Sequence, residues 1–325
     1  KSSKITMIKT FLASLLTLTF ALADAHILVY HRFDEPRHAS TDISIQNLRA
    51  QFEYFKNNGY EVVKLSRLVD AVNAGEPIPD NWIVITIDDG YKSFYNNALE
   101  LFKEYNYPFA LMVYVEASAN KYGDYLDFDQ IKELEAYGEI GYHSYAHPRM
   151  TKLSDEALRE DFQKGVETFE KHMGYKPKYF AVPYGEIDSR VVSLAKEFGF
   201  LALLNQNSGA VSDKSDVFDL YRTPVMNGTK IALTFNSKFL NAQWIFPEGY
   251  PQNNAIDKLI IKTDTNASEG SFFMTGFDGF RKVPMTNGVF ECKFNPPLDK
   301  RKVLMSLKVD HHRSTKLLIK DINAK

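Results

Sequence analysis

The chain has 325 residues, of which 44% are hydrophobic and 14% are aromatic. This length and composition predict a globular protein of about two domains, with ample material for buried cores. The charges of its 39 basic and 41 acidic residues nearly cancel, so the chain lacks the net positive charge typical of proteins that bind nucleic acid or an anionic membrane. If it binds a polymer, a neutral or weakly charged one is favoured.

The first 23 residues have the pattern of an export signal. Lys9 supplies a small positive region, residues 11–20 form a short apolar run, and Ala-Leu-Ala at 21–23 fits a small-x-small cleavage site. We therefore expect residues 1–23 to comprise a signal peptide with the residues that precede it. The apolar run is too short to span a bilayer comfortably and no second run of that length follows, so no membrane span is expected in the mature chain.

Cys292 is the one cysteine of the sequence, so no internal disulfide can form. An exported chain without a disulfide fits the periplasm of a Gram-negative bacterium or a secreted location. Its core must then hold together without covalent cross-links.

From residue 25 onward, strand patterns alternate with helix patterns. Apolar runs predict strands at residues 27–30, 60–65, 83–88, 109–115, 139–142, 179–182 and 200–204. Apolar residues at helical spacing predict helices at about 48–58, 65–74, 97–105, 127–137, 154–173 and 189–198. Such alternation predicts an α/β domain with a mostly parallel sheet or a barrel, with functional groups at the carboxyl ends of its strands. We expect this domain to span residues 24–228.

The pattern changes from about residue 232, where helical periodicity fades. Short apolar runs, punctuated by Gly, Asn, Asp and Pro, lie at residues 258–263, 270–275, 289–294, 303–309 and 316–322. They predict a small all-β domain of sandwich type over residues 232–325. The segment 226–251, which contains Trp244 and two prolines, is expected to carry the junction.

Two adjacent carboxylates, Asp88 and Asp89, follow the buried run that begins at Ile83. Successive side chains of a regular strand point to opposite faces, so both can share one pocket only where the pleat ends, and Gly90 supplies that freedom. The carboxyl end of a buried strand is where a functional site belongs. Taken alone, the motif could also be a turn that merely ends a strand.

Two histidines, His143 and His147, follow the predicted strand at 139–142. A pair four residues apart can face one metal ion, although Gly141 and Pro148 indicate a turn or loop at this point. Taken alone, the two side chains could equally be core or surface histidines that bind no metal.

Together, these two motifs predict a metal site. Two imidazoles and one carboxylate form the ligand set of a catalytic zinc site with an open position, so Asp89 is expected to be the carboxylate ligand. Asp88 would then be an unligated base beside the ion. A cation against Asp89 would also make two adjacent like charges tolerable.

Three motifs in order carry a resemblance to a known family. They are TIDDGY at 86–91, HSYAHPRMTKLS at 143–154 and FAVPYG at 180–185. They resemble the first three motifs of the polysaccharide deacetylase family, the NodB-homology domain of carbohydrate esterase family 4, over roughly residues 25–225. The resemblance implies a distorted (β/α) barrel and metal-dependent hydrolysis of N-acetyl groups on aminosugar polymers. It also implies one divalent ion, with zinc favoured and cobalt, nickel or manganese as alternatives.

The resemblance carries roles over by position. Asp88 resembles the general base of the family, and the metal triad is matched by Asp89, His143 and His147. Pro183 and Tyr184 resemble the wall of the substrate groove, with the backbone amide of Tyr184 as an oxyanion donor.

The sequence departs from the family pattern at two places. Many members have an arginine where this chain has Ala181, so the partner that would orient Asp88 is missing or supplied elsewhere. No late Leu-x-His motif supplies the usual acid. The branch of the family that deacetylates poly-β-1,6-N-acetylglucosamine has a third motif without arginine and an early histidine like His31, and LYRTPV at 220–225 also resembles that branch.

His31 is therefore expected to be the general acid that protonates the amine leaving group, with a nearby carboxylate favouring its protonated form. A core histidine bonded to the backbone is the alternative. The predicted function is N-deacetylation of an exopolysaccharide such as poly-β-1,6-N-acetylglucosamine. Deacetylation of peptidoglycan, hydrolysis of O-acetyl esters and glycan binding with weak or no turnover remain as alternatives.

Overall fold

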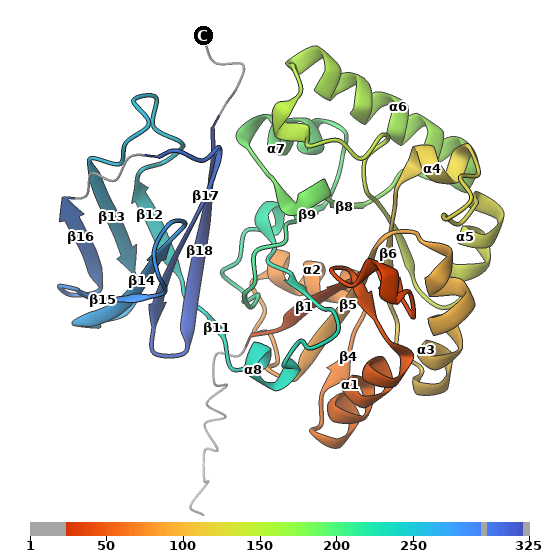
Figure 1. The fold of residues 1–325 in the computed structure, drawn as a ribbon, viewed down its shortest axis with the longest axis horizontal. Coiled ribbons are helices and arrows are strands. Elements are labelled where there is room, and N and C mark those ends of the chain that lie inside the picture. The colour runs from red at the N-terminus through yellow and green to blue at the C-terminus, as the bar shows by residue number, and fades with distance from the viewer. Residues whose placement is uncertain (1–23, 294–297, 321–325) are drawn as a thin grey trace, which may run out of the picture.

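The computed structural model describes residues 24–293 and 298–320. Its strands and helices form two units that lie side by side (Figure 1). We call them the barrel unit, built on a parallel sheet with surrounding helices, and the β unit, built on two largely antiparallel sheets. Among the described residues, no helix is both long enough and apolar enough to cross a membrane.

The barrel unit contains an eight-stranded sheet in which every pairing is parallel. Its order is β10 (Thr223–Pro224), β1 (His26–Tyr30), β5 (Trp82–Asp89), β6 (Ala110–Val113), β7 (Glu139–Tyr142), β8 (Tyr179–Ala181) and β9 (Ala202–Leu204), and β4 (Glu61–Val62) pairs with the start of β5. A separate pair joins β2 (Arg32–Phe33) to β3 (Asp42–Ile43).

The ring is completed by a short segment rather than by a full strand. Leu220 forms a parallel bridge with Leu204 of β9, and β10 then pairs with β1. The predicted distorted (β/α) barrel is therefore confirmed.

Helices cover this sheet and share two buried clusters with its two faces. They are α1 (Ile45–Asn57), α2 (Leu65–Ala74), α3 (Leu99–Tyr105), α4 (Val115–Ala119), α5 (Phe128–Leu134), α6 (Asp155–Met173) and α7 (Ser189–Glu197). In β5, Ile83, Ile85 and Ile87 join the larger cluster, whereas Trp82 and Val84 join the smaller one. The alternation sends Thr86 and Asp88 to the face of the smaller cluster.

The β unit is a sandwich, as the sequence predicts. One sheet has the order β11 (Lys238–Phe239), β18 (His312–Ile319), β17 (Lys302–Val309), β14 (Glu269–Met274) and β15 (Arg281–Pro284). The other has the order β12 (Ala242–Phe246), β13 (Lys258–Thr263) and β16 (Val289–Lys293). Both sheets contribute to one buried cluster, and the sheet that contains β11, β18 and β17 lies on the side of the barrel unit (Figure 1).

Several predicted boundaries differ from the structure. The strand predicted to end at Asp88 continues through Asp89, and α5 ends at Leu134 rather than near 137 because three-residue turns replace helical bonding beyond it. The predicted helix start at 97 falls inside a π turn, residues 94–98, that precedes α3. The junction segment also contains a short helix, α8 (Ile231–Phe235), that the sequence pattern did not indicate. The domain limits 24–228 and 232–325 stay predictions.

Candidate metal centre

Asp88 and Asp89 lie at the carboxyl end of β5, where the strand pleat breaks. Asp89 itself has a left-handed φ of 71°, and Gly90 follows with a φ of 78°. The sequence analysis attributes the end of the regular pleat to Gly90 alone, but the left-handed backbone begins one residue earlier, at Asp89. Aspartate tolerates the left-handed region better than most residues with a side chain, and such strained positions gather at functional sites. Both carboxylates are buried, with 0% and 7% of Asp88 and Asp89 exposed.

The two histidines come from the loop after β7. In the sheet, Tyr142 pairs with Val113, and Val113 pairs with Asp89, so His143 lies level with the end of β5 two strands away. The backbone of His147 also adopts a left-handed φ, 53°, and its N–H donates to the Ser144 hydroxyl at 2.8 Å.

The buried Asp161 of α6 holds the middle of this loop. Its two carboxylate oxygens accept the backbone N–H groups of Tyr145 and Ala146, at 3.1 and 2.9 Å. The loop therefore has a fixed shape that brings both imidazoles to one side.

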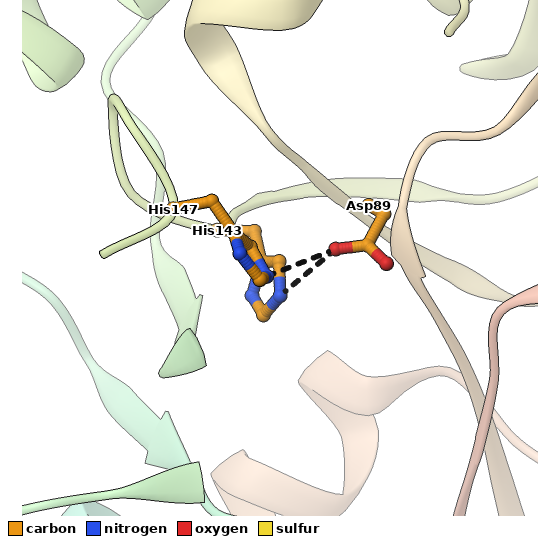
Figure 2. A group of neighbouring side chains, drawn as sticks. All are labelled: Asp89, His143 and His147. Atoms are coloured by element: carbon orange, nitrogen blue, oxygen red, sulfur yellow. Dashed lines mark ion pairs between the residues drawn. The ribbon is translucent and has the colours of Figure 1, made fainter. Parts of the chain in front are cut away.

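The three side chains predicted to form the triad meet at one point. Oδ1 of Asp89 lies 3.3 Å from Nε2 of His143 and 3.2 Å from Nε2 of His147, and Figure 2 shows this one oxygen facing both rings. One ligand atom from each residue lies within 4.8 Å of the other two. Two ligand atoms that are each about 2.0–2.1 Å from a tetrahedral zinc ion lie roughly 3.3–3.4 Å apart, so the spacing fits such an ion.

The tautomer of His143 is also suited to a ligand. Its Nδ1 donates to the carbonyl oxygen of Ala181 at 2.6 Å, which leaves Nε2 directed at Asp89. A backbone acceptor on one ring nitrogen is the arrangement that fixes and orients metal-binding histidines. The donor set and its support thus fit one divalent cation.

Asp88 has a different partner, Arg222. The guanidinium lies entirely buried and contacts both carboxylate oxygens, with Nη1–Oδ1 at 2.7 Å and Nη2–Oδ2 at 2.9 Å. Its other donors reach the Thr86 hydroxyl at 3.1 Å and the Asn205 carbonyl at 2.8 Å. This bidentate contact fixes the plane of the Asp88 carboxylate.

Sequence reasoning missed Arg222. The sequence shows the loss of an arginine at Ala181, and the motif LYRTPV at 220–225 contains the replacement, but nothing in their spacing connects them. The structure does so because β10 closes the ring beside β1, which also pairs with β5.

Different neighbours lower the pKa values of the two aspartates. Burial alone would raise the pKa of Asp88, but Arg222 and His143 outweigh it, so the pKa of Asp88 lies below its usual value. Burial also opposes ionisation of Asp89, yet contacts with His143 and His147 hold the pKa of Asp89 well below its usual value. Both groups are therefore carboxylates at neutral pH, and the site attracts positive charge.

The structure places His31 at the same end of the sheet. It follows β1, in which Tyr30 pairs with Ile87, so His31 is level with Asp88 on the neighbouring strand. Burial lowers the pKa of His31, although the carboxylates of Asp88 and Asp89 oppose that shift. The two carboxylates thus favour the protonated ring, as expected, while burial opposes them with a larger effect. The role of His31 as the acid stays a prediction.

Pro183 and Tyr184 lie beside the triad, in the turn that follows β8. The Tyr184 ring packs edge-on against His147, with ring centres 4.9 Å apart, and 39% of the residue is exposed. Tyr184 has a left-handed φ of 60°. A half-exposed aromatic ring at this place is compatible with a groove wall, and that role stays a prediction.

Comparison with known proteins matches a segment of the chain to a family model. Residues 75–203 match the family model named polysaccharide deacetylase. A poly-β-1,6-N-acetyl-D-glucosamine N-deacetylase of Escherichia coli K12 is 23% identical over 226 residues, which are 57% of this chain and 34% of that protein. This chain thus spans about a third of the length of that relative.

Two solved structures share the fold of the barrel unit. The deacetylase PplD of Streptococcus pyogenes, in complex with acetate, superposes with a TM-score of 0.59 at 19% identity and covers 64% of this chain and 95% of its own. IcaB of Ammonifex degensii superposes with a TM-score of 0.57 at 22% identity and covers 65% and 96%. The matched family segment contains both aspartates and both histidines but neither His31 nor Arg222. Residues 75–203 thus contain a polysaccharide deacetylase domain.

Proposed function

We propose that this chain is a metal-dependent hydrolase that removes N-acetyl groups from a polysaccharide containing N-acetylglucosamine, such as poly-β-1,6-N-acetylglucosamine. The observation that carries the proposal is the meeting of an Asp-His-His triad with a second carboxylate that an arginine holds in a fixed plane. The E. coli relative, whose name specifies this polymer, supports the choice of substrate.

Asp89, His143 and His147 would hold one divalent ion, and two nitrogen donors with one oxygen donor favour zinc. Such an ion, when bound, supplies a Lewis acid for the acetyl carbonyl and for the attacking water. Asp88 lies beside the triad, with its Oδ2 3.9 Å from Nε2 of His143.

Asp88 accepts the proton of the attacking water in this proposal. Its carboxylate is ionised at neutral pH, and Arg222 prevents it from turning toward the triad as a fourth ligand. The backbone amide of Tyr184 would donate to the oxyanion, a contribution worth about 3–4 kcal/mol for one donor.

His31 would then protonate the amine as the C–N bond breaks, because an unprotonated amine is a poor leaving group. Its position supports this role, since it enters the mouth of the barrel from β1, on the side of Asp88 away from β6 and β7. Among the described residues of the barrel unit, no histidine follows β8 in the chain, so none there competes with His31 for the role of the acid.

A glycan-binding protein without turnover is less well supported than an enzyme. The main sequence feature that suggests lost activity is the missing arginine at Ala181. Arg222 contacts both carboxylate oxygens of Asp88 and can replace that arginine. The proposed location is the periplasm or the cell exterior. It depends on the export signal predicted for residues 1–23, which lie outside the described residues.

Acetate release tests the function. The purified, zinc-loaded chain should release acetate from β-1,6-linked N-acetylglucosamine oligomers faster than from β-1,4-linked oligomers or whole peptidoglycan. Chelation should abolish release, and added zinc, cobalt or nickel should restore it. No release from any glycan after metal is restored would overturn the proposal, and a preference for peptidoglycan or for O-acetyl esters would replace the substrate.

A further inference from the structure

A buried carboxylate, Glu186, lies two residues after Tyr184. None of its surface is exposed, which is rare for a glutamate unless it is paired. Its Oε1 accepts from Arg149, and its Oε2 accepts from the Thr151 hydroxyl at 3.1 Å and from Arg301. Burial alone would raise the pKa of Glu186, but the two arginines lower it below its usual value.

One of these partners comes from the β unit. Arg301 precedes β17, and its guanidinium contacts both Glu186 and the Thr151 hydroxyl, the latter at 3.1 Å. Its side chain is 21% exposed, so the contact is largely shielded from water. An ion pair with a fully buried partner is far more sensitive to loss of one member than a surface pair.

The network continues from Glu186 to the groove wall. The Arg149 guanidinium that donates to Glu186 lies over the ring of Tyr184, 4.0 Å from its centre. The same ring packs against His147 of the triad. A continuous set of contacts thus runs from Arg301 through Glu186 and Arg149 to Tyr184.

A second contact between the units ends beside the base. The Tyr221 hydroxyl donates to the Thr315 carbonyl of β18 at 2.5 Å and accepts from the Thr315 N–H at 3.2 Å. Tyr221 directly precedes Arg222, the residue that holds Asp88. The β unit therefore contacts the barrel unit at Glu186, which follows the groove wall, and at Tyr221, which precedes the arginine that holds the base.

We propose that the β unit is a positioning element of the active site, in which Arg301 fixes the groove wall by holding Glu186, and through it Arg149 and Tyr184. This inference rests on the proposed function for its kinetic consequences. It assigns to Arg301 a role in orienting substrate, not in the chemical step.

Kinetics on β-1,6-linked N-acetylglucosamine oligomers tests the role. Arg301→Ala should lower kcat/KM about ten- to hundredfold, mainly through a higher KM, because a misplaced wall misorients the glycan. Arg301→Lys should recover part of the loss, since lysine keeps the charge but cannot contact Glu186 and Thr151 together. Arg281→Ala, a matched change in β15 at the far edge of the same sheet, should leave kcat/KM unchanged. Equal kcat/KM for wild type and Arg301→Ala would overturn the inference.

A double-mutant cycle separates positioning from general damage. If Arg301 acts through the Tyr184 ring, Arg301→Ala should cost less than about twofold in kcat/KM when Tyr184→Ala is already present. Independent, multiplying losses would show that Arg301 does not act through this ring.

Amide hydrogen exchange supplies a readout that does not depend on activity. Backbone amides of residues 184–186 should exchange faster in Arg301→Ala than in wild type or Arg281→Ala. The global unfolding temperature of the barrel unit should change little, because Arg149 and the Thr151 hydroxyl still contact Glu186. Unchanged exchange would overturn the inference. If the wild type released no acetate from any glycan, the proposed function would fail, and this measurement would still decide whether Arg301 orders the wall.

Discussion

At the residue scale, the site separates two adjacent carboxylates by their partners. Asp88 is held by a guanidinium, and Asp89 by two imidazoles. The left-handed φ of Asp89 lets both side chains open toward the same mouth although they are neighbours in a strand. The division predicts that equivalent substitutions in the two residues have different effects.

Asp88→Asn should lower acetate release by about two to four orders of magnitude, because the amide keeps the shape but cannot accept the proton. Its zinc content should stay near that of the wild type. Asp89→Asn should instead lose the metal, since a carboxylate ligand is replaced by a weaker neutral one. Metal analysis of both purified variants decides the matter, and equal zinc contents would show that the roles are assigned wrongly.

Arg222→Lys should lower kcat about tenfold or more with little change in zinc content. Lysine keeps the charge, but one ammonium cannot reproduce the two parallel contacts to Asp88. Arg222→Ala should in addition cost about 3–5 kcal/mol of unfolding free energy, because it leaves Asp88 buried without its partner. Wild-type kcat in Arg222→Lys would show that the orientation of Asp88 is not limiting.

His31→Ala should impair N-deacetylation heavily, about a hundredfold or more, and spare an activated acetyl ester whose leaving group needs no proton. The comparison uses one preparation with both substrates. Equal loss of both activities would indicate structural damage or a role other than proton donation.

At the element scale, most strands and most helices follow from the sequence, whereas closure of the ring does not. The predicted helices at 65–74 and 154–173 match α2 and α6 within one residue because both have strong apolar spacing and clear end signals. Strand β15 was missed because its side chains are mostly exposed at a sheet edge. The contact between Arg222 and Asp88 depends on two short strand pairings, Leu220 with Leu204 and β10 with β1. No local sequence pattern predicts either pairing.

Asp161 offers a test of how α6 supports the metal loop. Asp161→Ala removes both acceptors for the N–H groups of Tyr145 and Ala146, so the orientation of His147 should loosen and zinc affinity should fall about 10–100-fold. Asp155→Ala, in the exposed first turn of the same helix, should leave zinc affinity unchanged. A zinc titration that found equal affinity in Asp161→Ala would show that the loop holds its shape without this side chain.

At the scale of the whole molecule, the pH dependence of stability has an identifiable contributor. His26, at the start of β1, is 1% exposed and packs against Phe235 of α8. Burial, aided by Lys238, lowers the pKa of His26 to about 3. The unfolded chain binds a proton at this residue below about pH 6.5 and the folded chain does not, so stability is present above that pH and declines as pH falls toward 3.

Between pH 6.5 and 4.5, His26 should therefore cost about 1.4 kcal/mol of unfolding free energy for each pH unit. Denaturant titrations at pH 7.5 and 4.5 should show a smaller difference for His26→Leu than for the wild type, since leucine binds no proton. His311→Gln, at an exposed turn, should keep the wild-type difference. Identical pH dependence in His26→Leu and wild type would mean that His26 titrates alike in both states.

The closure of the barrel by residues 220–224 also orders events in time. Asp88 and Arg222 are 134 residues apart, whereas Asp89, His143 and His147 all belong to the first half of the chain. During synthesis, the complete set of metal ligands leaves the ribosome well before the arginine that orients the base. We therefore expect metal binding and the proposed deacetylation to be separable, because deacetylation also needs the last parallel pairing, between β10 and β1, to form. Metal loading and catalytic competence would then be separate steps of maturation.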